Sequence, residues 1–153
     1  MRKNRTPPRA AIGGFTLIEL MITVAIVAVL ATIAAAAYSR QVQQSRRTDA
    51  RTALMDLAGR EEKLFSTTNA YSAAATDLGY VGVFPQAVGS GYYTVNVLAP
   101  DPAQGVATPT TFSITATAIG TQANDGAWLT LSVNQTGVQT STGTGTVATC
   151  WGN

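Results

Sequence analysis

The longest apolar run in this chain lies near its N-terminus and ends where charged residues become frequent. The 18 residues from Leu20 to Ala37 carry no charge, and the apolar character extends back to Phe15 with only Glu19 interrupting it. A stretch of about 20 apolar residues matches the hydrocarbon thickness of a bilayer. The pattern therefore predicts a hydrophobic transmembrane helix over residues 15–39.

After residue 39 the pattern becomes amphipathic. Apolar residues then recur at the spacing of one helical face, at Ala50, Ala53, Leu54, Leu57, Ala58, Leu64 and Phe65. No Pro or Gly lies between Phe15 and Ala58, and the single Gly59 costs a helix only about 1 kcal/mol relative to Ala. We expect one continuous helix from Phe15 to about Phe65, whose second half (residues 40–65) packs on a sheet.

The rest of the chain predicts a loop followed by a small sheet. Residues 66–91 are punctuated by Gly and Pro, which indicates a connecting loop. Four aromatic or aliphatic side chains are spaced along this loop as anchors: Tyr71, Leu78, Tyr80 and Phe84. Beyond the loop, strand-like runs are separated by turn signals and cover residues 91–98, 111–119, 128–133 and, more weakly, 137–140. We therefore expect an α+β fold, in which the amphipathic helix covers an antiparallel meander of three or four strands within residues 92–153, ending in a C-terminal loop.

Charge is sparse and unevenly placed. Charged residues are 12% of the chain, against about 25% in an average protein. Residues 1–14 carry four bases and no acid, and removing them would change the net charge from +2 to −2. No Lys or Arg follows Lys63. Phosphate binding needs clustered cations, so a nucleic-acid partner is not expected, and the bases within residues 40–63 are interpreted as a solvated helix face.

The composition also argues against catalysis. The chain has no His and a single Cys, Cys150, which excludes a Cys/His zinc site, an intrachain disulfide and a catalytic triad. The aspartates beyond Lys63 are isolated, at Asp77, Asp101 and Asp125. We expect no enzyme activity, no metal and no cofactor. Cys150 is expected to be unpaired and buried as a small apolar residue, with intermolecular pairing as the alternative.

The boundary before the apolar run carries the most specific signal. Gly13 and Gly14 precede Phe15, and Glu19 lies just inside the run. An ordinary signal peptide is the alternative, because the small residues 34–37 offer a conceivable cleavage site. A carboxylate within a membrane costs about 2.5–3.5 kcal/mol, although a helix N-terminus reduces that cost. Glu19 is therefore either an interfacial acid or the partner of a positive charge, such as an amine freed by cleavage before Phe15.

The segment Gly14-Phe15-Thr16-Leu17-Ile18-Glu19-Leu20 resembles the N-terminal motif of type IV prepilins and is close to its commonest form. The resemblance implies cleavage between Gly14 and Phe15 by a membrane prepilin peptidase, which would remove the leader 1–14. It also implies N-methylation of Phe15 and a role for Glu19 in subunit registration, where Glu19 meets a neighbour's N-terminal amine. Residues 15–39 would then be both a membrane anchor and a filament-core helix.

The order of helix, loop, meander and terminal Cys-Trp is similar to that of PilE-like pilins and related minor pilins. That similarity implies a structural subunit of a type IV pilus serving adhesion or twitching motility. Its partners would be other pilin subunits, the prepilin peptidase and the inner-membrane assembly machinery. The expected location is the bacterial inner membrane, with the head in the periplasm, and then the extracellular pilus.

Two departures from the pilin pattern bear on whether the chain is a major or a minor pilin. Cys150 lacks the upstream partner found in many relatives, and Ala36 stands where many major pilins carry a helix-kinking proline. Both departures tilt the interpretation towards a minor pilin. A DNA-uptake (competence) pilin and a pseudopilin of a type II secretion system share the same N-terminal chemistry and stay open as alternatives.

Overall fold

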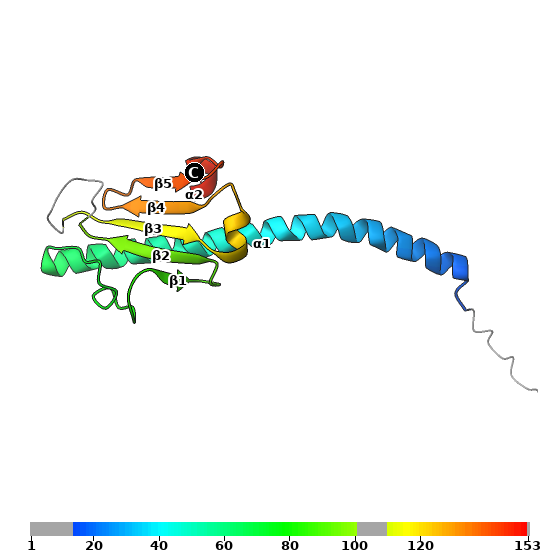
Figure 1. Cartoon of the computed structure of the whole chain (residues 1–153), viewed down its shortest axis with the longest axis horizontal. Helices are drawn as coiled ribbons and strands as arrows, with labels where there is room; N and C mark the ends of the chain where they lie inside the picture. Colours follow the sequence, from blue (N-terminus) through cyan, green and yellow to red (C-terminus); the bar gives the residue numbers. More distant parts are fainter. Residues whose placement is uncertain (1–13, 101–109, 153) are drawn as a thin grey trace, which may run out of the picture. The chain divides into compact units, whose positions relative to one another are not determined.

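The computed structural model describes residues 14–100 and 110–152 (Figure 1). The expected basic leader, apart from Gly14, lies outside these residues, and so does the isolated Asp101. Along the chain the elements are α1 (Leu17–Thr68), β1 (Gln86–Val88), β2 (Tyr93–Leu98), β3 (Ser113–Ala118), a 3-10 helix η2 (Gly120–Asn124), β4 (Thr130–Asn134), β5 (Gln139–Thr142) and α2 (Val147–Trp151). The chain divides into two units at Ser39/Arg40.

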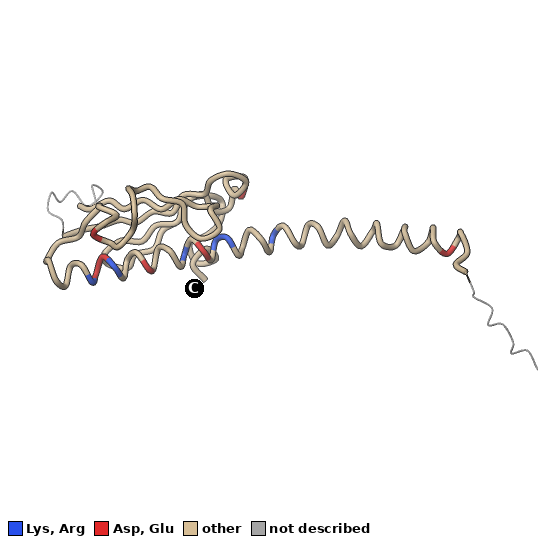
Figure 2. The backbone as a smooth tube through the Cα atoms, turned by 90° about the horizontal axis from the view of Figure 1, so that it is seen from below, with Lys and Arg blue, Asp and Glu red and all other residues tan. Residues whose placement is uncertain are grey.

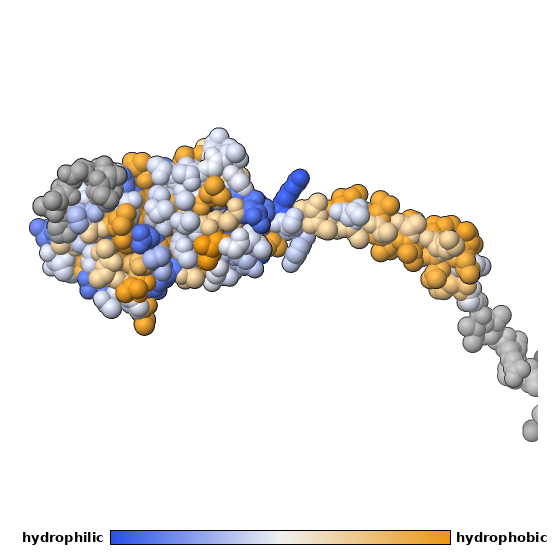
Figure 3. Space-filling view, viewed as in Figure 1, coloured by the Kyte–Doolittle hydropathy of each residue, from blue (hydrophilic) through white to orange (hydrophobic). Residues whose placement is uncertain are grey.

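The N-terminal unit consists of the first part of α1 and the residues just before it. All its described residues, from Gly14 to Ser39, are exposed, and Figure 3 shows the apolar colouring of this surface. Thr16 caps the helix, since its Oγ1 accepts a hydrogen bond from the Glu19 N–H at 3.3 Å, as Thr does at a helix N-terminus. By length and composition α1 qualifies to cross a membrane.

The second unit, which we call the head (residues 40–152), is built on a five-stranded sheet. The strands lie in the order β1-β2-β3-β4-β5 with every neighbouring pair antiparallel, as Figure 1 shows. The predicted meander is confirmed, but with five strands rather than three or four. The extra strand, β1, lies within the predicted loop 66–91, and its three residues are too few to show an alternation of polar and apolar positions.

The second half of α1 covers one face of this sheet and forms the core with it. Ala50, Leu54 and Leu57 are fully buried and pack against the inward residues of the strands. Those inward residues alternate along each strand, so that Val95, Ala116 and Leu131 fall in one register row. The predicted apolar stripe is confirmed, and Glu61, one turn beyond Leu57, continues it as a buried acid.

The helix ends three residues later than predicted. Asn69 follows Thr68 with a φ of 59°, and its N–H donates to the Phe65 carbonyl at 2.8 Å. A left-handed residue just beyond the last turn is a common helix end, and Asn tolerates it better than most residues. The chain then folds back along α1.

The loop after α1 is pinned by its aromatic residues, as the sequence predicted. Tyr71 is buried and stacks on Phe65 with ring centroids 4.5 Å apart. The Tyr71 ring also meets Phe112 edge-on at 4.8 Å. Leu78 is buried too, while Tyr80 and Phe84 pack half-buried against the same core.

The C-terminal segment, predicted as a loop, contains the short helix α2. Thr146 caps α2 by accepting a hydrogen bond from the Thr149 N–H at 3.2 Å, and Gly152 ends it at a φ of 79°. Cys150 and Trp151 are buried, and the Trp151 Nε1–H donates to the Thr140 carbonyl of β5 at 3.2 Å. This hydrogen bond satisfies the Thr140 carbonyl on the edge strand β5 and holds α2 against that strand.

Candidate functional site

The predicted processing site lies in an exposed, non-helical segment directly before α1. Gly14 and Phe15 are exposed, with Phe15 at 81%, and α1 begins at Leu17. A Cβ built on Gly14 would meet no atom within 4 Å, and the Gly14 φ does not lie in the left-handed region. Nothing in the described chain therefore requires glycine at this position, so any such requirement must come from outside the chain.

Glu19 lies in the first turn of α1, where the free backbone N–H groups favour a negative charge. Its side chain is exposed. Within the described ranges, no Lys or Arg side chain lies within ion-pair distance of its carboxylate. The three predicted site residues, Gly14, Phe15 and Glu19, are thus close in sequence at one exposed helix end, and the charge of Glu19 lacks a compensating partner there.

A second group of polar side chains links α1 to residues 122–128 of the head. The Arg47 guanidinium forms an ion pair with Asp125, with a Nε to Oδ2 distance of 2.8 Å, and lies 3.6 Å from the Trp128 ring centroid. Gln122 Nε2 donates to the same Asp125 oxygen at 3.0 Å. The side chains of Arg47 and Asp125 are only 16% and 7% exposed. The prediction of a solvated basic face is therefore wrong for Arg47.

Arg46, the preceding residue, makes a similar contact with a residue just before β2 and with η2. Its guanidinium lies 3.4 Å from the Tyr92 ring centroid, and Nη1 donates to Thr121 Oγ1 at 3.3 Å. Both arginines are therefore engaged with aromatic rings and polar groups of the head. Because a cation over an aromatic face is attracted to the ring, these contacts hold α1 against η2 and β2.

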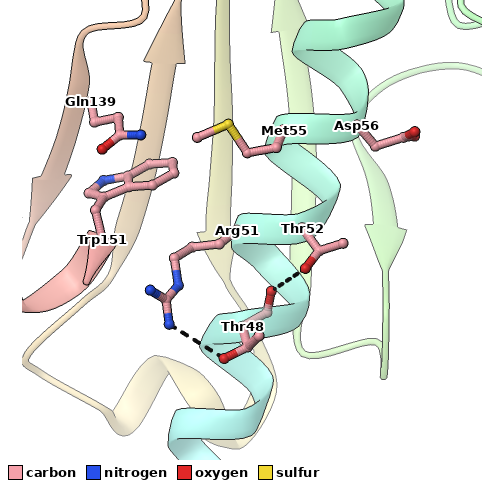
Figure 4. Close-up of a pocket in the computed structure, with 7 residues that line it drawn as sticks. All are labelled: Thr48, Arg51, Thr52, Met55, Asp56, Gln139 and Trp151. Carbon is pink, nitrogen blue, oxygen red and sulfur yellow. Dashed lines mark hydrogen bonds between the residues drawn. The ribbon is translucent and has the colours of Figure 1, made fainter. Parts of the chain in front are cut away.

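Arg51 lies in an open groove of about 670 Å³ between α1 and the β5 side of the head. Figure 4 shows the residues that line it, which are Thr48, Arg51, Thr52, Met55 and Asp56 from α1, Gln139 from β5 and Trp151 from α2. The Arg51 Nη2 donates weakly to Thr48 Oγ1 at 3.4 Å, while its Nε is buried without an acceptor. Behind the groove, burial raises the pKa of the Cys150 thiol, and the Arg51 charge opposes that shift.

The charges of the described residues fall almost entirely on α1. Figure 2 shows every Lys and Arg of the described chain on this helix and only isolated acids elsewhere. Within the described ranges, no cluster of three or more His, Cys, Asp or Glu side chains could hold a metal ion. Sequence reasoning missed two buried acids, Asp125 and Glu61. For Glu61 a signal existed, because it stands four residues after Leu57 on the apolar stripe.

The apolar helix, the Gly14/Phe15 boundary and the antiparallel head together define a type IV pilin. A family model for the prokaryotic N-terminal methylation motif matches residues 9–35, and a model described as "Type IV minor pilin ComP, DNA uptake sequence receptor" matches residues 36–132. The second match covers well over half of the chain. The chain therefore belongs to the ComP family of type IV minor pilins, which agrees with the pilin and minor-pilin resemblance of its sequence.

The chain is also similar to a curated pilin and to a solved pilin structure. The chain is 40% identical over 80 residues to the type IV major pilin protein PilA of Myxococcus xanthus (strain DK1622). That alignment covers 52% of this chain and 36% of PilA, so the matched segment spans about a third of the relative's length. A solved structure of a type IV pilin from Shewanella oneidensis matches with a TM-score of 0.45 and 24% identity, covering 63% of this chain and 89% of that chain.

Proposed function

We propose that this pilin is a minor structural subunit of a type IV pilus, cut between Gly14 and Phe15 and assembled through its apolar helix. The observation that carries the proposal is the exposure of the whole segment 14–39, in which Leu17 is 77% and Ile33 is 66% exposed. An apolar surface of this size is not stable in water and needs a bilayer or neighbouring helices to cover it. A pilin meets these two environments in turn, first the membrane and then the filament core.

Cleavage at Gly14 would change the electrostatics of this helix end in two ways. It would remove the four bases of residues 1–14, which favour a cytoplasmic N-terminus. It would also create an amine on Phe15, four residues before Glu19 and just outside α1. In an apolar filament core an uncompensated carboxylate is costly, so the Glu19 of one subunit gains from meeting the amine of a neighbour. N-methylation of Phe15 keeps that amine basic.

The registration role is tested by Glu19→Val, with Thr23→Val as the matched control on the same helix. We expect Glu19→Val to be cleaved normally but to be depleted from sheared filaments at least tenfold. Thr23→Val removes a hydroxyl that only bonds the Leu20 carbonyl at 2.8 Å, so it should be incorporated like the wild type. Wild-type incorporation of Glu19→Val would refute the role of this carboxylate.

The processing claim is tested at Gly14. Because a Cβ there meets no atom of the chain, Gly14→Val should leave the fold intact while uncut precursor accumulates in the membrane. Intact-mass measurement of the membrane form reads out the cleavage and any methyl group on Phe15. A wild-type membrane form that still carries residues 1–14 would contradict the proposal.

DNA uptake is the second candidate function, because the matched family is described as a DNA uptake sequence receptor. The described residues restrict where DNA could bind, since Arg46 and Arg47 are engaged within the head and no Lys or Arg follows Lys63. Arg51, in its open groove, is the best-placed cation for a phosphate. Neutralising Arg47 would also destabilise the head, so a loss of DNA binding by that variant would not identify a DNA contact. Arg51→Gln is the better variant because Arg51 forms no ion pair with Asp125.

The DNA experiment is a retardation assay with duplex DNA over a salt series. If Arg51 contacts a phosphate, Arg51→Gln should weaken binding and reduce the slope of log affinity against log salt by about 1. Arg60→Gln is the control, because Arg60 is already paired with Asp56 at 2.8 Å. The absence of retardation by the wild type at low salt would eliminate this candidate and leave the structural role.

A further inference from the structure

Glu61 is a fully buried acid in the core of the head, at 0% exposure. It stands on the face of α1 that packs against the sheet, one turn after Leu57, where a leucine would continue the apolar stripe. Among the charged side chains of the described head it has the least solvent contact. An ionised carboxylate without a cation is costly in such a place, and the usual response is that the group takes up a proton instead.

The charged groups that act on Glu61 do not compensate for a negative charge, and only one hydrogen bond does so in part. Oε2 accepts one hydrogen bond, from the Ser72 N–H at 3.1 Å, while Oε1 is buried with no hydrogen-bond partner. The charged groups that act on it are Glu62 on its own helix and Asp77 on the segment after the helix, and both are acids. The strands β1–β5 carry no Asp, Glu, Lys or Arg. Burial first, and then these two acids, raise the pKa of Glu61 to about 7, although the hydrogen bond from the Ser72 N–H opposes part of that rise.

The backbone that meets Glu61 belongs to the segment that follows the helix, which we call the Ser72 segment (residues 69–80). Tyr71 anchors this segment separately, by stacking on Phe65 and donating to Glu62 Oε1 at 3.0 Å. Ser72 is the junction of this segment, since its Oγ donates to Asp77 at 2.6 Å and accepts from the Ala74 N–H at 3.1 Å. The far end is held separately, by Arg60 Nη1 donating to the Leu78 carbonyl at 3.0 Å. A change at Glu61 therefore acts on the middle of the segment first.

We infer that Glu61 is a proton-dependent latch, which holds the Ser72 segment on α1 while its carboxyl is protonated and releases that segment when the proton is lost. In the closed state the neutral carboxyl is tolerated in the core and the Ser72 N–H remains bonded. After deprotonation, the buried charge favours an opening that brings water to the carboxylate. The latch responds to the pH outside the cytoplasm if the head lies there, although the chemistry itself does not depend on filament assembly.

The direction of the pH effect follows from proton linkage. The closed state binds the proton with a pKa of about 7, whereas a solvated Glu has a value of 4.5. The closed state thus holds more protons between these values, and rising pH favours opening. From pH 5.5 to pH 8 the opening equilibrium of the Ser72 segment should rise about thirtyfold.

The test is hydrogen exchange of the full chain in detergent micelles at pH 5.5 and pH 8, corrected for the intrinsic exchange rates. Amides of residues 70–76 should lose about thirtyfold in protection in the wild type. Glu61→Gln keeps the shape but cannot ionise, so it should lose most of this dependence. Asp49→Asn neutralises an acid on the same helix that bonds Ser90 rather than the Ser72 segment, so this variant should retain the dependence.

A second measurement keeps the inference testable if Glu61→Gln folds poorly. Carbon-13 NMR of the side-chain carboxyl should show the wild-type Glu61 titrating near pH 7. A titration near 4.5 would overturn the latch. Equal pH dependence of protection in the wild type and in a folded Glu61→Gln would overturn it as well.

Discussion

The ion pair between Arg47 and Asp125 offers the sharpest test of how the head is held on α1. We consider Arg47→Met, which keeps the aliphatic length of the side chain and removes the charge. Asp125 would then be left 7% exposed with the Gln122 amide as its remaining side-chain partner. Breaking a buried ion pair by removing one partner costs about 3–5 kcal/mol, and Arg47 retains some solvent contact, so we expect a loss of about 3 kcal/mol.

The cost of leaving the Asp125 charge without its partner can be separated from the loss of the contact between Arg47 and Trp128. A cation over an aromatic ring contributes about 0.5–2 kcal/mol, and Met keeps part of that contact through its thioether. In an Asp125→Asn background no ionised carboxylate remains to be stranded. There, the same Arg47→Met change should cost only about 1 kcal/mol, which is the usual scale of a single hydrogen bond.

The assay is thermal unfolding of the full chain in detergent, followed by far-ultraviolet circular dichroism. A loss of 3 kcal/mol in a unit of this size lowers Tm by more than about 10 °C. The matched control is Arg60→Met, because Arg60 and Asp56 form an i,i+4 pair with side chains 43% and 48% exposed. That variant loses an exposed ion pair and a hydrogen bond to the Leu78 carbonyl, so it should cost about 1–2 kcal/mol. Equal losses in the two variants, or fully additive effects of Arg47→Met and Asp125→Asn, would refute the reasoning.

Two further variants and one labelling experiment test the core and the C-terminal segment. Leu54→Ala opens a cavity at a fully buried position beneath the sheet and should cost about 2–5 kcal/mol by denaturant unfolding, whereas a loss below 1 kcal/mol would mean that α1 packs loosely. Cys150 is 2% exposed and burial raises the pKa of its thiol, so a thiol reagent at pH 8 should label it only after denaturation, and prompt labelling of the folded chain would contradict its burial. Trp151→Phe removes the donor to the Thr140 carbonyl and should cost about 1 kcal/mol by denaturant unfolding, whereas unchanged stability would contradict a role for this hydrogen bond.

The regular elements were largely predictable because their patterns are local. A bilayer-length apolar run, a helical stripe and the two-residue alternation of strands can each be recognised within about ten to twenty residues. The helix stripe of Ala50, Leu54 and Leu57 and the runs that form β2, β3 and β4 were found in this way. Strand β1 was not, since three residues carry no periodic signal and form a strand only because β2 offers a free edge.

The predicted site residues and the arginines of α1 differ in how much the tertiary structure reveals about them beyond the sequence. Gly14, Phe15 and Glu19 are sequence neighbours, so their proximity needs no tertiary structure, and the fold adds only that they are exposed. Their roles in cleavage, methylation and registration stay predictions. The arginines of α1 are the opposite case, because the sequence favoured a solvated face and the fold engages Arg46 and Arg47 with aromatic rings of the head.

By itself, the sequence determined that this chain has an apolar helix preceded by a prepilin-type boundary, and that a small antiparallel head follows. Only the tertiary structure decided which charged groups leave water. Arg47 and Asp125 are 78 positions apart, and Glu61 meets the backbone of Ser72 only because the chain turns back at Asn69. The physical reason is that the free energy of a charge depends on the atoms around it in space, whereas a periodic pattern records only which face of an element is apolar.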